Sequence, residues 1–411
     1  MPIVRSHAQA MNASHRFAAW LQQHGKASGP LTIAAMIVAF AMVNSPFRSI
    51  YRLVHHTPVA IRVGSLMVEK PLILWINEGL MVFFFLLVAL EIKREILEGH
   101  LDSPARVAFP ALAALGGMLA PAAIYLLFTW SDPAARRGWA IPSATDTVLA
   151  LAALNLLGAR VPPAVRTFLL ALAIFDDLGA IVILAALFTK SLSVASLAVA
   201  AVALIVLAAL NRMGVTRPSA YVAAGLALWL AVLESGVHAT VAGFLIGLAI
   251  PLRTAGNKPS PLRAAERGLR PWVALGIVPV FAFFNSGIDL TDLATGQLSG
   301  AIALGTALAL FVGKPAGILG VGWASVRLGL AHPPHGAHWS QLAGASMLAG
   351  IGFTMSLFFA GVAFGTNEAL ALSAKVGILA GSLAAAVFGI AYLAATAARP
   401  AKSGEREGRA A

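Results

Sequence analysis

The chain has 411 residues, of which 59% are apolar and only 11% charged, and its mean hydropathy is +0.83. Soluble domains carry about 25% charged residues, so this composition excludes an ordinary soluble fold. The chain has no cysteine, which excludes disulfides, thiolate metal sites and cysteine nucleophiles. Apolar stretches of about 20 residues follow one another almost end to end, and each is long enough to cross a bilayer as an α-helix.

These stretches predict an all-α polytopic membrane protein with twelve transmembrane helices. In chain order the predicted spans are residues 30–46, 75–98, 107–130, 139–158, 163–188, 192–211, 218–234, 237–251, 271–288, 299–327, 342–366 and 369–397. The chain then divides into an N-terminal segment (1–29), a membrane domain (30–397) and a C-terminal tail (398–411). Between spans, only the loops at 48–74 and 252–270 are long.

The net charge of +12 is distributed unequally between the two sides of the membrane. With twelve spans both termini lie on one side, and that side carries 20 Lys and Arg residues against 7 on the other. Because loops rich in Lys and Arg stay inside, we expect the termini to be cytoplasmic. The basic residues therefore orient the chain among membrane lipids, and no nucleic-acid partner is predicted.

The first long loop contains one segment with β-type patterning. Residues 58–71, PVAIRVGSLMVEKP, form two short runs around Gly64 and Ser65. Glycine at the first turn position favours a two-residue hairpin of type II′. A hairpin outside a helical bundle has a free edge that can pair with a second copy, although a lone surface hairpin fits the sequence equally well.

Charged residues inside apolar spans are the candidate functional residues. Asp146 lies in the fourth span, and Asp176 and Asp177 lie side by side in the fifth, within ALAIFDDLGAIVIL. Buried carboxylates are costly, so they protonate, pair or bind a cation. Successive helical residues point about 100° apart, so the two adjacent Asp side chains face different surroundings. Lys314, deep in the tenth span, is positioned to pair with one of them. A purely structural salt bridge would leave the other two Asp residues unexplained.

Two spans are interrupted by helix-breaking residues. Pro142 comes just before Thr145 and Asp146 in the fourth span, and Gly350 and Gly352 lie within the eleventh. Glycine in a membrane helix more often makes a packing contact. However, spans three to five and ten to twelve are seven spans apart and so run in opposite directions. Interrupted helices at corresponding positions of inverted repeats indicate the binding site of a transporter.

Two interrupted helices that cross at mid-membrane bring together two positive N-terminal ends and two negative C-terminal ends. We expect Asp146 to compensate the first pair of ends and Lys314 the second. Asp176 and Asp177 then remain to handle a transported charge. With the Thr145 hydroxyl and carbonyls freed by the breaks, they offer hard oxygen ligands that suit Na⁺ or Li⁺ and also hold protons. No cofactor beyond the transported ions is predicted.

At these residues the sequence resembles the NhaA family of bacterial Na⁺/H⁺ antiporters. The matching motifs are WINEGLMVFFFLLVALEIKRE at 75–95, GWAIPSATDTVLAL at 138–151, ALAIFDDLGA at 171–180, SGVHAT at 235–240, FVGKPAG at 311–317 and GIGFTMSLF at 350–358. The resemblance implies twelve helices with inverted repeats and a crossing of the fourth and eleventh spans. It also implies electrogenic, pH-regulated exchange of Na⁺ or Li⁺ for protons by alternating access, in the bacterial inner membrane.

The resemblance further assigns roles to residues. Asp177 is implied to be the main ion and proton carrier, with Asp176 as its partner paired to Lys314, while Thr145 and Asp146 line the site. The residues implied to sense pH at a cytoplasmic funnel are Glu91, Arg94, Glu95, His238, Glu266 and Arg270. The hairpin at 58–71 is implied to form the contact of a homodimer.

The chain departs from the family pattern in two places. Glu78 stands at the periplasmic entrance, where the family usually has Asp. Arg267 and Arg270 stand where family members can carry His, and arginine does not titrate near neutral pH. The position of the pH threshold is therefore not predicted.

Two other classes of protein compete with an antiporter. A Na⁺-selective channel would also explain buried acids, but it gives no reason for inverted, interrupted helices with a compensating lysine. Saturable ion flux coupled to protons distinguishes the two. A membrane enzyme is the third class, and it is disfavoured because the buried His and acidic residues lack a metal-ligand spacing such as HExxH.

Overall fold

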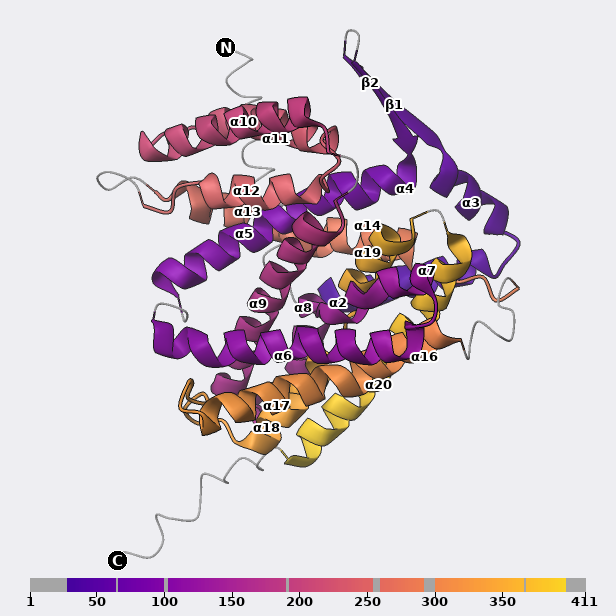
Figure 1. Ribbon diagram of the computed structural model, residues 1–411, viewed down its shortest axis with the longest axis vertical. Coiled ribbons are helices and arrows are strands. Elements are labelled where there is room, and N and C mark those ends of the chain that lie inside the picture. Colours follow the sequence, from indigo (N-terminus) through magenta and orange to yellow (C-terminus); the bar gives the residue numbers. More distant parts are fainter. Residues whose placement is uncertain are drawn as a thin grey trace, which may run out of the picture.

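The computed structural model describes residues 28–63, 66–99, 103–189, 192–253, 259–291, 300–365 and 367–396. Over these ranges the chain is a bundle of helices with one two-stranded sheet (Figure 1). The predicted terminal segments at 1–29 and 398–411 lie outside the described residues, apart from Ser28 and Gly29, which begin the first described helix.

Within the described ranges, seven helices are long and apolar enough to cross a membrane. They are α4–η2–α5 (Leu72–Glu98), α6 (Pro104–Thr129), α9 (Pro163–Leu187), α10 (Val194–Arg212), α13–η5–α14 (Pro261–Asn285), α16–η6–α17 (Ala301–Arg327) and α20 (Glu368–Thr396). Two further pairs pass the same test but are bent: α2 (Ser28–Val43) with α3 (Arg48–His56) by 111°, and α18 (Trp339–Ala349) with α19 (Phe353–Phe364) by 44°. Shorter helices complete the bundle, namely α7 (Pro133–Arg136), η3 (Arg137–Ser143), α8 (Thr147–Leu156), η4 (Gly158–Arg160), α11 (Pro218–Leu233) and α12 (Thr240–Ala249).

The predicted polytopic helical fold is confirmed, because a helix overlaps each of the twelve predicted spans. The differences lie in helix length and in the loops. Apart from the very short α4 and α7, two helices occupy segments expected to be loops: α3 within 48–74 and the first half of α13–η5–α14 within 252–270. Both carry apolar residues on one face only, so their mean hydropathy is low and hydropathy alone does not reveal them.

The predicted hairpin is present. β1 (Pro58–Val63) pairs with β2 (Leu66–Pro71) in antiparallel register, from Pro58 opposite Pro71 to Val63 opposite Leu66. The turn residues Gly64 and Ser65, and with them the predicted turn type, lie outside the described residues. The hairpin projects from one end of the bundle (Figure 1), and the Trp75 indole N–H anchors its base by donating to the carbonyl oxygen of Val59 at 2.9 Å.

Two sets of three helical segments share one design, in which the middle segment is interrupted. The first set is α6, η3–α8 and α9, and the second is α16–α17, α18–α19 and α20. The first members of the two sets pack in antiparallel fashion, since Gly116 meets Gly317 while Phe128, further along α6, meets Gly305. The first helices of the two sets thus run in opposite directions, as inverted repeats require.

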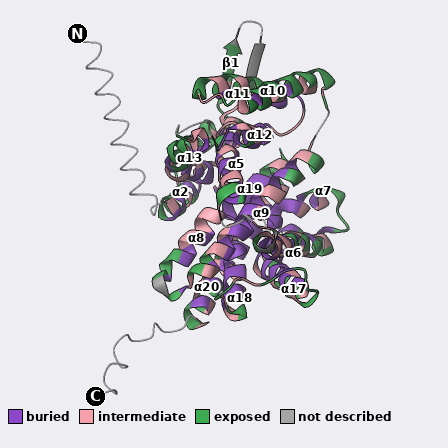
Figure 2. Cartoon of the chain, turned by 90° about the vertical axis from the view of Figure 1, so that its left-hand side faces the viewer, coloured by how far each residue is buried: buried purple, intermediate pink, exposed green. Residues whose placement is uncertain are grey.

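The centre of the bundle is formed by α9, which contacts α6, α8, α18 and η3. Figure 2 shows buried residues along the middle of the bundle and exposed residues on its outer helices. Many outward side chains are large and apolar, for example Val194 on α10 at 80% exposed and Val222 on α11 at 69%. An apolar outer surface of this kind is suited to contact with lipid, whereas Asp176 and Asp177 are buried residues of α9.

Candidate functional site

The two interrupted segments touch each other at their breaks. Between η3 and α8 the backbone is extended at Ala144 and Asp146, and between α18 and α19 the helix opens at Gly350–Gly352. The Asp146 backbone N–H donates to the carbonyl oxygen of Ile351 at 2.6 Å. A Cβ atom at Gly350 would lie 2.5 Å from the carbonyl oxygen of Leu310, so glycine is required here by close packing as well as by the break.

Asp146 binds the N-terminal ends of both helices that begin at the crossing. Its Oδ1 accepts the Leu149 backbone N–H at 3.0 Å and so caps α8. Its Oδ2 accepts the backbone N–H of Thr354, in the first turn of α19, at 3.0 Å and the Thr354 hydroxyl at 2.6 Å. One buried carboxylate thus faces two positive helix ends, which is the electrostatic compensation predicted from the sequence.

Lys314 contacts a C-terminal helix end at the crossing, whereas Asp146 contacts the N-terminal ends. Its ammonium donates to the carbonyl oxygen of Ser143, the last residue of η3, and lies 2.8 Å from Asp176 Oδ2. Neither side chain of the pair is exposed. The Thr145 hydroxyl is 2.6 Å from the same Asp176 oxygen and 2.8 Å from the carbonyl oxygen of Ala349, and its single proton can be donated to one of them at a time. The predicted pairing of Lys314 with Asp176 is therefore present.

Asp177 differs from its neighbour in having no such support. It is 5% exposed, and its Oδ1 has no hydrogen-bond partner among the described residues. The second oxygen of Asp176, Oδ1, is also without a partner there. Two carboxylate oxygens on adjacent residues of α9 thus remain buried and unsatisfied, a state that a proton or a cation resolves.

Thr354 and the particular carbonyl groups used at the crossing were not predicted from the sequence. Thr354 bonds Asp146, and the carbonyl oxygens of Ser143 and Ala349 bond Lys314 and Thr145. The signal for Thr354 was its place directly after the interrupting glycines. The carbonyls carried no signal, because which backbone groups a break exposes depends on the path of the chain.

Five of the six predicted pH-sensing residues form one ion-pair network between α5 (Met81–Glu98) and α13 (Pro261–Trp272). Arg94 lies 2.8 Å from Glu95 and 3.0 Å from Glu266. Arg270 lies 2.8 Å from both Glu91 and Glu266. Glu95 and Glu266 are buried, so the network is partly shielded from solvent.

The sixth predicted residue, His238, does not lie with the other five. It precedes α12, which runs beside α5 in the same direction, since Gly243 faces Val82 and Gly247 faces Ala89. The C-terminal end of α12 is thus the end near the network, and ten residues of helix rise about 15 Å. The predicted position of His238 at the cytoplasmic funnel is wrong: because it opens the eighth span, it lies at the opposite end of the helix.

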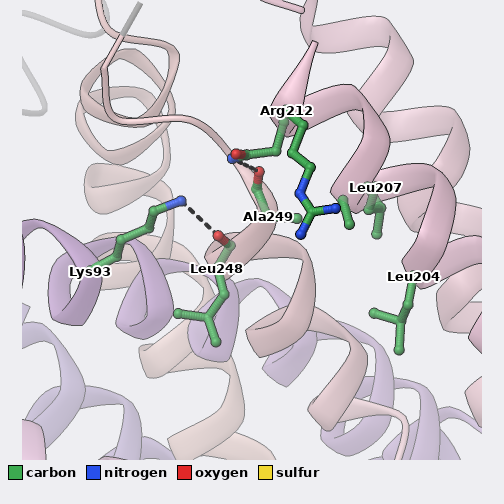
Figure 3. A pocket seen from close by; sticks show the side chains of 8 residues that line it. Lys93, Leu204, Leu207, Arg212, Leu248 and Ala249 are labelled. Carbon is green, nitrogen blue, oxygen red and sulfur yellow. Dashed lines mark hydrogen bonds between the residues drawn. The ribbon is translucent and has the colours of Figure 1, made fainter. Parts of the chain in front are cut away.

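Lys93 joins α5 to the C-terminal end of α12. Its ammonium donates to the carbonyl oxygen of Leu248 at 2.7 Å (Figure 3) and to that of Ile250 at 2.6 Å. Asn211 of α10 donates to the intervening carbonyl of Ala249. Lys93 and Asn211 line a pocket between α5, α10 and the end of α12. Their hydrogen bonds satisfy the C-terminal carbonyls of α12, and the charge of Lys93 complements the negative end of its dipole.

The two departures from the family pattern have different surroundings. Glu78 forms an ion pair of 2.7 Å with Lys70 of β2, which ties the hairpin to the start of the second span. Arg270 belongs to the ion-pair network, whereas the Nε–H of Arg267 donates to the carbonyl oxygen of Arg263 within its own helix. Only one of the two arginines therefore contacts the predicted sensor residues.

In the described part of the chain, no three His, Asp or Glu side chains are close enough to hold a metal ion by themselves. A cation at Asp176 and Asp177 would therefore need hydroxyl, carbonyl or water ligands as well. All of these are hard oxygen ligands, the type that hard cations such as Na⁺ or Li⁺ prefer.

The chain is similar to known proteins over most of its length. The family model described as Na⁺/H⁺ antiporter 1 matches residues 19–393. A Na⁺/H⁺ antiporter NhaA of Pseudomonas fluorescens is 48% identical over 375 residues, covering 91% of this chain and 95% of that protein. One of Yersinia pseudotuberculosis is 50% identical over 368 residues, covering 89% and 93%. This chain is therefore a member of the NhaA family of Na⁺/H⁺ antiporters, a family of multi-span membrane transporters.

Proposed function

We propose that this antiporter exports Na⁺ or Li⁺ across the bacterial inner membrane, and that Asp177 and Asp176 alternately hold the cation and protons. One observation carries the residue assignment. Asp177 is buried beside Asp176, and each has an oxygen without a partner among the described residues, although the other oxygen of Asp176 is held by Lys314 and Thr145. The pair thus has ligands available for a small cation.

Cation and protons compete for these carboxylates. When Na⁺ binds Asp177, the negative charge is neutralised without a proton, and when a proton binds, the site loses a ligand for Na⁺. Because one shared site cannot hold both, alternating exposure to the two sides produces exchange. If both carboxylates take up protons while one Na⁺ leaves, each cycle moves net charge, which makes the exchange electrogenic.

The crossing gives this site a polar lining without leaving helix ends uncompensated. Asp146 holds the two N-terminal ends, and Lys314 holds a C-terminal carbonyl and Asp176. A short half-helix can shift relative to its neighbour more readily than a continuous span can. This supports alternating access through movement at the two breaks.

We further propose that the network of Glu91, Arg94, Glu95, Glu266 and Arg270 adjusts activity to cytoplasmic pH. It contains three carboxylates held by two guanidinium groups, so protonation of any carboxylate weakens contacts between α5 and α13. The network lies at the same end of α5 as Lys93, and the positive-inside rule supports a cytoplasmic position for that end.

The same orientation puts the hairpin on the periplasmic side, where it is available to a second copy. Its free edges can pair with another hairpin, which supports a homodimer.

The decisive variant is Asp177→Asn, which keeps the shape of the side chain and removes its charge. In everted vesicles that maintain a pH gradient, addition of Na⁺ should no longer release protons, because the site cannot exchange one cation for another. Asp132→Asn, an exposed residue that caps α7, is the matched control and should behave like the parent. Na⁺-dependent proton release by a normally folded Asp177→Asn protein would show that Asp177 is not the carrier.

A further inference from the structure

The amphipathic helix α3 has no place in the ion pathway described above. It follows α2 at an angle of 111° and lies at the end of the bundle that carries α7 and the base of the hairpin (Figure 1). Since α2 crosses the membrane, a helix bent this far lies along the membrane surface. Under the proposed orientation this is the periplasmic surface.

One face of α3 turns its polar groups inward. The Tyr51 hydroxyl is 2.9 Å from the carbonyl oxygen of Phe283 and 3.1 Å from that of Phe284. His55 Nε2 contacts the same Phe284 carbonyl. These carbonyls belong to the last turn of α14 (Val278–Asn285), so α3 satisfies a helix end of the bundle.

Two arginines extend this inward face. Arg48 lies 2.5 Å and Arg52 3.0 Å from Asp289, which is buried to 7% exposure, and Arg48 also donates to the Thr291 hydroxyl at 2.8 Å. At 100° per residue, positions 48, 51, 52 and 55 occupy one side of the helix. The polar side of α3 is therefore tied to the protein by hydrogen bonds and ion pairs, while the Arg52 side chain stays 51% exposed.

The opposite side of α3 is apolar and exposed. Phe47 is 59% exposed, Ile50 50%, Leu53 70% and Val54 38%. Their spacing of three and four residues places them on one face, roughly opposite Tyr51 and Arg52. A helix on an aqueous surface would be arranged the other way, with Arg and His outward.

This apolar face continues a surface that faces lipid. On α2, which precedes it, Ile33 is 47% exposed, Ile37 62% and Phe40 40%. The exposed apolar strip of α2 is therefore followed by the exposed apolar face of α3, with only the short corner at Asn44–Pro46 between them. An unpartnered face that is continuous with the lipid-facing belt is covered by the same lipid.

We propose that α3 is an interfacial helix that seats Phe47, Ile50, Leu53 and Val54 in the headgroup–acyl boundary of the outer leaflet. Such helices bury their apolar face about 5–10 Å into that boundary. The occupant is the phospholipid bilayer itself, and its effect is to hold the outer end of α14 through Tyr51 and His55. The side of the membrane rests on the proposed orientation, but the seating in lipid does not.

The chain has no cysteine, so a single spin label can be placed at will. We would compare labels at Leu53→Cys, at Val202→Cys in the middle of α10, and at Ala134→Cys on α7, in full-length protein reconstituted into phosphatidylcholine–phosphatidylglycerol vesicles. The measurement is the ratio of collision with oxygen, which dissolves in lipid, to collision with a nickel chelate, which stays in water. Val202 is 61% exposed within a span, and Ala134 lies exposed beside the N-cap of α7.

The ratio at Leu53 should lie between those at Val202 and Ala134, as for a shallow lipid position. A ratio equal to that at Ala134 would show that the face is in water. Low collision with both reagents, with dipolar broadening between labels, would show that it is covered by a second copy. Either result overturns the proposal, and because all three variants are remote from the ion site, retained Na⁺/H⁺ exchange confirms correct folding independently.

Discussion

Lys314 shows at the scale of a single residue how the site tolerates charge inside the membrane. Both Lys314 and Asp176 are fully buried, and moving an isolated charge out of water is costly. The pair persists because the two interacting groups each have a further partner: the Ser143 carbonyl accepts from Lys314, and the Thr145 hydroxyl contacts Asp176 Oδ2. Asp177 has no equivalent partners for its Oδ1 among the described residues, so this oxygen remains available to a proton or a cation.

Lys314→Ala should therefore destabilise the protein strongly, because it leaves Asp176 buried without its partner. Removing one member of a buried pair costs about 3–5 kcal/mol. The readout is thermal unfolding of the purified protein in detergent, and Lys70→Ala, which breaks the partly exposed pair with Glu78, is the control at about 0–1 kcal/mol. Unfolding of Lys314→Ala at the parent temperature would contradict the buried pair. Adding Asp176→Asn to Lys314→Ala should cost less than the two single changes together, as coupling requires.

At the scale of elements, the interrupted segments are too short to be stable alone. α8 has 10 residues and α19 has 12, and isolated helices of that length are marginal even in favourable sequences. Their first turns are held by a single carboxylate, Asp146, while packing against α9 and η3 supplies the rest. One side chain thus organises two helices that are far apart in sequence.

The loss of stability caused by a substitution at Asp146 should depend on how many helix ends stay capped. A hydrogen bond to a charged group contributes about 1.5–3 kcal/mol, and Asp146 accepts from two backbone N–H groups and one hydroxyl. Asp146→Asn keeps one oxygen and caps one helix, whereas Asp146→Ala caps neither. Melting temperatures should fall from parent to Asn to Ala. Equal melting of all three would show that the carboxylate does not hold the crossing.

The anchor of α3 at Asp289 should depend on pH. Burial raises the pKa of this carboxyl, but the Thr291 hydrogen bonds and the charges of Arg48 and Arg52 outweigh it and hold the pKa below its ordinary value. A carboxyl whose pKa is lower in the folded than in the unfolded protein stabilises the folded state at pH values above its unfolded-state pKa, near 3.9. This contribution is lost as the pH falls through the folded-state pKa. Asp289→Asn should therefore melt earlier than the parent at neutral pH. The difference should shrink as the pH is lowered below about 4, and a difference that stays constant would contradict the charge pairing.

Much of the site was accessible from the sequence because membrane burial makes each charged residue informative. Asp146, Asp176 and Lys314 stand out against uncharged spans, and the breaks at Pro142 and Gly350 locate the crossing. Local chemistry therefore predicted the contacts at the centre.

Other features depend on information that local patterns lack. α3 and the first half of α13–α14 are amphipathic, so averaged hydropathy hides them. His238 was grouped with Glu266 by motif, although the count of spans places the two on opposite sides of the membrane. The ion pairs among Glu91, Arg94 and Arg270 arise only when α5 and α13 pack together.

At the scale of the whole molecule, the two ends of the bundle carry different structural features. The hairpin, α3 and α7 gather at one end, and the ion-pair network and Lys93 at the other. Under the proposed orientation, which rests on the excess of Lys and Arg, the second end is the cytoplasmic one. Asp176 and Asp177 lie between the ends, as a site served from both sides must.

Orientation can be tested with the same cysteine-free chain. A maleimide that does not cross membranes should label Ala134→Cys in intact cells and leave Ala264→Cys on α13 unlabelled, because these residues lie at opposite ends of the bundle. In everted vesicles the labelling pattern of the two variants should be reversed. The reverse pattern would invert the topology and would place the ion-pair network outside the cell.

The claim that Na⁺ and protons share Asp177 and Asp176 is tested by one titration. Na⁺-induced proton release from everted vesicles is measured with a pH-gradient dye from about pH 6.5 to 9, around the titration range of perturbed acids, at several Na⁺ concentrations. If the ions compete, the activity midpoint should fall by about one pH unit for each tenfold increase in Na⁺ when one proton must leave, and by half as much when two must leave. Glu266→Gln should displace the midpoint and preserve this slope, since the network lies outside the shared site. A midpoint that stays fixed as Na⁺ is varied would contradict a shared site and leave pH control to the network alone.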